Sequence, residues 1–177
     1  LSRDGGESWT SIMGELPGDL SWEGCLPMCV DSSGDLHPPD EIEDEAAFIK
    51  RKYSMSIAVD PDDDSHVLLG TTAHGVLESY DHGINWGPVL EPTEVLKTSH
   101  RDHIHAVDIH FDPTDSEVFY VADWNSGVVA TSDGGRTYER LREGLTSGVV
   151  QDLALSRDGM YLYAATEGHG VFVLRTY

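Results

Sequence analysis

Basic residues are scarce in this chain of 177 residues, which has 11 lysines and arginines against 32 aspartates and glutamates and a formal charge of −21. An electrostatic field of this sign repels nucleic acids and anionic membranes, so we expect neither as a partner. Acid-rich surfaces with few lysines suit solubility in high salt, which leaves a halophilic source open. An acidic extracellular protein is the simpler interpretation, and we favour it.

Cysteines and long apolar runs are also scarce. The only cysteines, Cys25 and Cys29, lie in one loop, where they could form a small disulfide or stay reduced. A zinc site would need two more ligands, and the sequence has no second cysteine pair. No apolar run is long enough to span a membrane, and no signal-peptide pattern is present. We therefore expect no cofactor and no membrane partner.

A short motif, Ser/Thr-x-Asp-x-Gly-x-x-aromatic, is present three times, at residues 2–9, 79–86 and 131–138. The aspartate can accept hydrogen bonds from backbone N–H groups of a turn, and the glycine supplies a backbone conformation that other residues resist. The aromatic residue then lies on the returning strand, where its ring can be buried. The residues expected to build the three turns are Ser2, Asp4, Gly6 and Trp9; Ser79, Asp81, Gly83 and Trp86; and Thr131, Asp133, Gly135 and Tyr138.

The sequence around the motif repeats with it. Residues 57–61 match 109–113, and Asp81 and Asp133 are 133 − 81 = 52 residues apart. A third unit begins at Leu153. Each unit consists of short apolar or alternating segments separated by Asp, Gly and Pro turns, and four strands in about 40–50 residues is the size of a β-propeller blade. We predict an all-β propeller of four-stranded antiparallel blades, with about three blades in this chain.

On these motifs the chain resembles the Asp-box (BNR) β-propeller family, over residues 1–12 and roughly 55–177. That family includes sialidases, xyloglucan-cleaving glycosidases, sortilin-type receptors and photosystem II stability factors, so its motif specifies the fold and not the activity. The resemblance implies that the Asp turns lie on the face opposite the active site. It also favours an extracellular or periplasmic location.

The repeat divides the chain into unequal parts of one propeller. We expect residues 1–12 to end a blade, 13–54 to form a long inter-blade insertion, 55–90 and 107–141 to form blades, and 150–177 to supply the first three strands of another. Propellers usually close with about 4–8 blades. The chain is therefore a piece of a longer propeller, one of two copies that complete a six-bladed ring, or an unusually small closed form.

Propeller topology places the connections between blades on one face, together with the turns between second and third strands. The connection over 91–106 contains a polar run in which Asp102 is a candidate acid or base. His103 and His105 are two residues apart and suit a pair of metal ligands, although we do not expect metal there. A polar loop or ordinary turn chemistry explains these residues equally well. The candidate ligand-binding residues are His74, Arg101, His103, His105, Trp124, Asn125 and His169.

We favour a non-catalytic scaffold or binding module that takes a protein or glycan on the inter-blade loop face. The alternative is a glycoside hydrolase portion, which would need two carboxylates about 5–10 Å apart. The sequence pairs no second carboxylate with Asp102. Sialidases that resemble this family carry a Phe/Tyr-Arg-Ile-Pro motif, which is absent, and an arginine cluster, whereas Arg3 and Arg136 lie in Asp turns. A role as an assembly factor rests on the repeats alone.

Overall fold

The computed structural model describes residues 29–30, 36–37, 54–71, 75–90, 105–124, 126–146 and 148–176. The first Asp turn, expected at residues 2–9, lies outside these ranges. Within the described ranges, no helix is long and apolar enough to cross a membrane.

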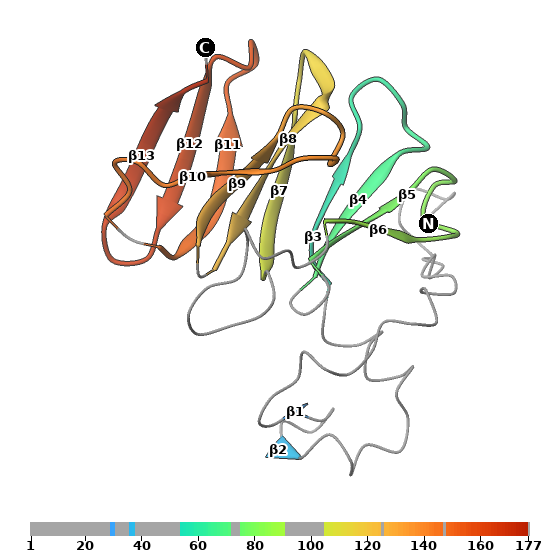
Figure 1. Cartoon of the computed structure of the whole chain (residues 1–177), viewed down its shortest axis with the longest axis horizontal. Helices are drawn as coiled ribbons and strands as arrows, with labels where there is room; N and C mark the ends of the chain where they lie inside the picture. Colours follow the sequence, from blue (N-terminus) through green and yellow to red (C-terminus); the bar gives the residue numbers. More distant parts are fainter. Residues whose placement is uncertain are drawn as a thin grey trace, which may run out of the picture.

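The described residues form three antiparallel sheets and one short hairpin. Consecutive strands pair in each sheet, and no helix interrupts them in the described ranges (Figure 1). The hairpin is β1 (Cys29–Val30) with β2 (Leu36–His37). The first sheet contains β3 (Ser54–Val59), β4 (Val67–Thr71), β5 (Val76–Ser79) and β6 (Gly87–Leu90). The middle sheet contains β7 (Ala106–Asp112), β8 (Asp115–Asp123), β9 (Gly127–Thr131) and β10 (Glu139–Leu141). The third sheet contains β11 (Val150–Leu155), β12 (Tyr161–Thr166) and β13 (Gly170–Arg175).

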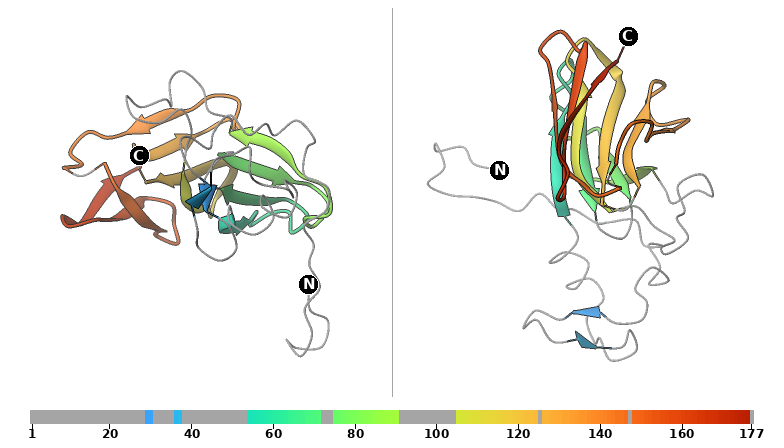
Figure 2. Two further views of the ribbon diagram at one scale, coloured as in Figure 1. Left: turned by 90° about the horizontal axis from the view of Figure 1, so that it is seen from below. Right: turned by 90° about the vertical axis from the view of Figure 1, so that its left-hand side faces the viewer.

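The middle sheet packs between the other two (Figures 1 and 2). Phe119, Val121 and Val129 point toward the first sheet and pack in one core with Leu68 and Val76. The alternate residues of the same strands point the other way, because successive side chains of a strand alternate between faces. They make a second core with the third sheet, which contains Tyr120, Ala122, Val128, Leu153, Leu162 and Ala164.

The first strands of the three sheets lie next to one another along one side of the stack, which we call its inner side. Strand β7 contacts both β3 and β11, and so these three strands form a continuous inner wall. The predicted all-β architecture of consecutive antiparallel strands is therefore confirmed.

The turn between β5 and β6 is organised by a carboxylate. Asp81 Oδ1 accepts hydrogen bonds from the backbone N–H of Asn85 at 2.8 Å and of Ile84 at 3.0 Å, and from the Ser79 hydroxyl at 2.8 Å. The Asn85 backbone and side-chain hydrogen bonds, followed by that of Ser79, lower the pKa of Asp81 to about 2. Gly83 has a φ of 86°, a conformation that favours glycine.

The turn between β9 and β10 repeats this arrangement. Asp133 accepts hydrogen bonds from the Thr137 hydroxyl at 2.7 Å and backbone N–H at 2.8 Å, which lower its pKa to about 2. The aromatic residue that follows, Tyr138, packs against Phe119 with ring centroids 6.4 Å apart. Its hydroxyl donates to the Val89 carbonyl at 2.6 Å, so the fourth strand of the middle sheet is tied to the fourth strand of the first sheet.

Candidate functional site

The described ranges contain three of the candidate ligand-binding residues, His105, Trp124 and His169. These lie at the end of the sheets where β7 begins and β8 and β12 end, which is the end that carries the connections between sheets. The candidate acid Asp102 and the candidates His74, Arg101, His103 and Asn125 lie outside the described residues.

His105 and Trp124 are held side by side by a buried carboxylate. Asp123, which is 1% exposed, accepts a hydrogen bond from the backbone N–H of His105 at 3.0 Å and another from the hydroxyl of Ser126. The backbone N–H of Trp124 donates to the carbonyl of His105 at 3.2 Å. The turn between β8 and β9 is thus fixed to the start of β7, while 39% of Trp124 remains exposed.

His169 belongs to the corresponding turn of the third sheet. It is exposed, and its Nδ1 lies 3.0 Å from the carbonyl oxygen of Glu167. The connection between the middle and third sheets joins the two turns, because the Gly127 N–H donates to the Gly148 carbonyl at 2.9 Å and the Glu167 N–H to the Val149 carbonyl at 3.1 Å. The structure therefore places His105, Trp124 and His169 on one face, with Trp124 and His169 in neighbouring turns.

A second polar group lies on the inner wall, where β7 meets β11. Asp108 Oδ2 accepts the backbone N–H of Leu153 at 2.7 Å, so a middle-sheet carboxylate binds an inner strand of the third sheet. His110 Nε2 lies 3.2 Å from the same carboxylate oxygen, and its side chain is 40% exposed. The Ile109 N–H donates to the other oxygen at 3.0 Å.

These contacts shift both titrations. Burial raises the pKa of Asp108, but hydrogen bonds from His110 and Leu153 outweigh it, so the net pKa lies below its usual value. The hydrogen bond to Asp108 raises the pKa of His110, against the opposing effect of burial. The pair is thus a half-buried carboxylate that favours the protonated form of the neighbouring imidazole, a stabilising arrangement more than a reactive one.

Asp108 and His110 were not among the candidates drawn from the sequence. Their spacing was a usable signal, since residues two apart share a face of a strand. Asp152 precedes Leu153 as Asp108 precedes Ile109, so the repeat also places a carboxylate at this position in the third unit. The contact with Leu153 depends on how the two sheets stack, and the sequence does not contain that information locally.

A third titratable group lies at the opposite end, beside the turn between β3 and β4. His66 Nδ1 is 2.8 Å from Asp60 Oδ2, and its ring stacks on Tyr80 with centroids 4.3 Å apart. Phe111 of the middle sheet meets the same ring edge-on at 5.4 Å. These contacts pack the first sheet against the middle sheet, which is a structural role.

Metal ligation has no complete donor set in the described part of the chain. No group of three or more histidine, cysteine, aspartate and glutamate side chains there could hold an ion. Of the predicted ligand pair, His103 lies outside the described residues.

No protein-family model and no curated protein matches the chain. Among solved structures, it is similar to a GH74 enzyme from Niastella koreensis, with 22% identity, a TM-score of 0.53, and coverage of 68% of this chain and 19% of that one. It is also similar to an ancestral GH74 enzyme, with 20% identity, a TM-score of 0.55, and coverage of 71% and 19%. YCF48 from Cyanidioschyzon merolae has 20% identity, a TM-score of 0.51, and coverage of 68% and 33%.

The chain therefore spans about a fifth of the two GH74 enzymes and a third of YCF48. Similarity at this level of identity concerns the fold, and all three are propeller proteins. The three stacked sheets of this chain therefore have the fold of a portion of a β-propeller, as the repeat in the sequence predicted.

Proposed function

We propose that this chain is a non-catalytic portion of an Asp-box propeller, which binds a glycan on the face that carries the connections between sheets. The hydrogen bonds that Asp81 and Asp133 accept from their own turns support the Asp-box assignment. Both turns lie at the end of the sheets opposite Trp124, so the proposed binding face and the Asp turns are separated.

The observation that carries the proposal is Trp124, whose backbone is fixed in its turn and which is 39% exposed. Its backbone is bonded to His105, and the neighbouring Asp123 closes the turn through Ser126. Tryptophan presents a large apolar face with one polar edge, and its few rotatable bonds mean that it loses little entropy on binding. Sugar rings have apolar faces of matching size, and the polar edges of a sugar can reach His105 and His169.

The carboxylates on and below this face favour binding over hydrolysis. A general acid or base must exchange a proton with the substrate at the reacting bond. Asp123 is buried and accepts hydrogen bonds from His105 and Ser126, and Asp108 accepts them from Ile109, His110 and Leu153. The protein itself engages both carboxylates, which argues against either as the second partner that hydrolysis requires and leaves that role in the hydrolase alternative to Glu167, exposed in the turn of His169.

Isothermal titration calorimetry with a xyloglucan oligosaccharide and with sialyllactose tests the proposal. We expect saturable binding of at least one sugar by the wild type, and a loss of about tenfold or more in affinity for Trp124→Ala, since truncating a central aromatic anchor typically removes over 1 kcal/mol. Tyr80→Ala is the matched control, because Tyr80 is an exposed aromatic residue at the opposite end, and it should bind as the wild type does.

Two outcomes contradict the proposal. Equal affinity for wild type and Trp124→Ala would show that the sugar binds elsewhere, and no binding of either sugar would leave a protein as the partner to test. Release of reducing sugar from the xyloglucan oligosaccharide or of sialic acid from sialyllactose would favour the hydrolase alternative instead.

A further inference from the structure

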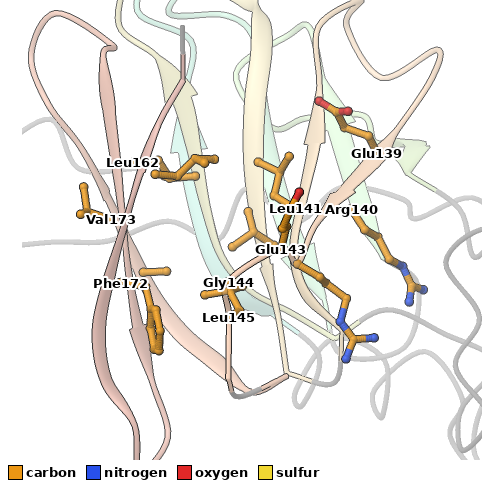
Figure 3. A pocket seen from close by; sticks show the side chains of 13 residues that line it. Glu139, Arg140, Leu141, Glu143, Gly144, Leu145, Leu162, Phe172 and Val173 are labelled. Carbon is orange, nitrogen blue, oxygen red and sulfur yellow. The ribbon is translucent and has the colours of Figure 1, made fainter.

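A pocket of about 390 Å³ opens between the outer parts of the middle and third sheets (Figure 3). Leu162 and Phe172 of the third sheet line one side. The other side is lined by Leu141 of β10 and by Leu145 of the connection that follows β10. The side chain of Arg140 points away from this space (Figure 3). Leucine and phenylalanine side chains thus line two sides of the pocket, with Arg142 and Glu143 also in its lining, and the pocket is large enough for an aromatic side chain.

The equivalent space between the first and middle sheets is already filled, by Tyr138. Its neighbours there are Phe119 of β8 and Val89 of β6. Ile109 and Leu153 hold equivalent positions in the repeat, and they pair with Val121 and Ala164. Phe119 and Leu162, which lie two residues before these partners on β8 and β12, are therefore equivalent as well.

Val89 and Leu141 are equivalent as well. Each follows the aromatic residue of its own Asp turn by three positions, Trp86 in one sheet and Tyr138 in the next. The pocket is therefore lined by the counterparts of the residues that receive Tyr138. A fourth strand on the third sheet would bring its own aromatic residue into this space.

The outer edge of β13 is where such a strand would pair. In the described part of the chain the third sheet has three strands, and none pairs with that edge. The first Asp-turn motif of the sequence, Ser2–Trp9, is followed by Thr10, Ser11 and Ile12 and lies outside the described residues. Its sequence has a turn aromatic residue followed by a short segment, and in the first and middle sheets such a segment forms the fourth strand.

We propose that residues 2–12 of a second copy of this chain form the fourth strand of the third sheet, with Trp9 in the pocket. The register follows from the middle sheet, in which Glu139 pairs with Ala130. Thr10 is equivalent to Glu139, because each directly follows the aromatic residue of its Asp-turn motif. Val173 is equivalent to Ala130, so Thr10 should stand opposite Val173.

Two exposed apolar faces favour a second copy over the chain's own segment. Val171 and Val173 of the third sheet are 70% and 60% exposed, and Ile57 and Val59 of the first sheet are 60% and 54% exposed. These faces point away from the middle sheet in opposite directions, because the two cores lie on opposite sides of that sheet. A second copy can cover both faces at once, because each copy presents one of them to the other.

Disulfide trapping tests the register and the partner together. All variants carry Cys25→Ser and Cys29→Ser; one copy carries Thr10→Cys and the other Val173→Cys. Paired residues of antiparallel strands lie close enough for a disulfide, and Val173 is exposed enough to be replaced without disturbing the fold. We expect a cross-linked dimer from the mixed copies under mild oxidation. Ile84→Cys, at an equally exposed site in the Asp turn of the first sheet, replaces Val173→Cys as the control and should give none.

Light scattering supplies the second measurement. We expect the wild type to have twice the mass of the 19.4 kDa chain. The dimer of Trp9→Ala should dissociate at concentrations about 30-fold higher or more than the wild-type dimer, because the variant loses an interfacial hot spot. Trp22→Ala, outside the proposed strand, should stay dimeric. A monomer that cross-links only when both cysteines are in one chain overturns the second copy, and a monomer that does not cross-link at all overturns the strand. Neither result depends on sugar binding.

Discussion

The middle and third sheets have the same strand order and nearly the same register, yet they differ in what they bury. Tyr120 of β8 and Tyr163 of β12 hold equivalent positions, opposite His110 and Ala154 on their first strands. Tyr120 is 6% exposed, whereas Tyr163 is 42% exposed. The alternation of side chains decides which residues share a face, but only a neighbouring sheet removes that face from water.

The difference shows that one unit of a stacked fold cannot account for its own stability. The middle sheet has cores on both faces, and the third has one described core, on the face toward the middle sheet. Because burial of apolar area is the main favourable term in folding, equal substitutions in the two sheets should have unequal effects.

The largest difference in the free energy of unfolding is expected between a core side chain of the middle sheet and a side chain on the outer face of the third sheet. Phe119→Ala removes a ring that is 1% exposed and that packs edge-on against Phe111 and Tyr138, so the free energy of unfolding should fall by about 3–5 kcal/mol. Val173→Ala, at a site that is 60% exposed, should change it by less than about 0.5 kcal/mol. Urea unfolding followed by circular dichroism, at a concentration where light scattering finds monomer, measures both.

Equal losses for the two variants would mean that the outer face of the third sheet is covered within the monomer. Raising the concentration sharpens the comparison. If a second copy covers this face, Val173→Ala should become more destabilising as the dimer forms, because unfolding is then coupled to dissociation.

A smaller difference is expected from the tyrosine hydroxyls. Tyr138→Phe leaves the Val89 carbonyl without the donor that now lies at 2.6 Å, and should lower the free energy of unfolding by about 0.5–1.5 kcal/mol. Tyr163→Phe should have almost no effect, because Tyr163 is 42% exposed and water can replace its hydroxyl interactions. The same urea experiment measures this pair. No loss for Tyr138→Phe would show that the bond between fourth strands contributes little to stacking.

The contrast also separates what the sequence contains from what it does not. The period of two and the Asp turns predicted the strands and their order, since both are properties of a few neighbouring residues. The same pattern placed Trp124 near a turn between a second and a third strand, but it did not predict how exposed the side chain is. The bond between Asp108 and the backbone of Leu153 did not, because it joins residues 45 positions apart across two sheets. Sheet stacking determines that contact, and a single repeat does not specify it.

The smallest effect is expected at that junction, where Asp108→Asn should change a titration more than stability. The pKa of His110 is raised from its usual value of 6.5, chiefly by its hydrogen bond to Asp108. The pairing therefore stabilises the fold fully below pH 6.5, and this contribution is lost as pH rises through the raised pKa of His110.

In Asp108→Asn the His110 pKa should fall, and NMR of the imidazole protons against pH measures it. Asp158→Asn, in a turn of the third sheet, is the control and should leave it unchanged. An unchanged titration in Asp108→Asn would assign the shift to Asp152 instead. Since His110 is 40% exposed, solvent weakens the pair, and the imidazole signal is a sharper test of the junction than unfolding.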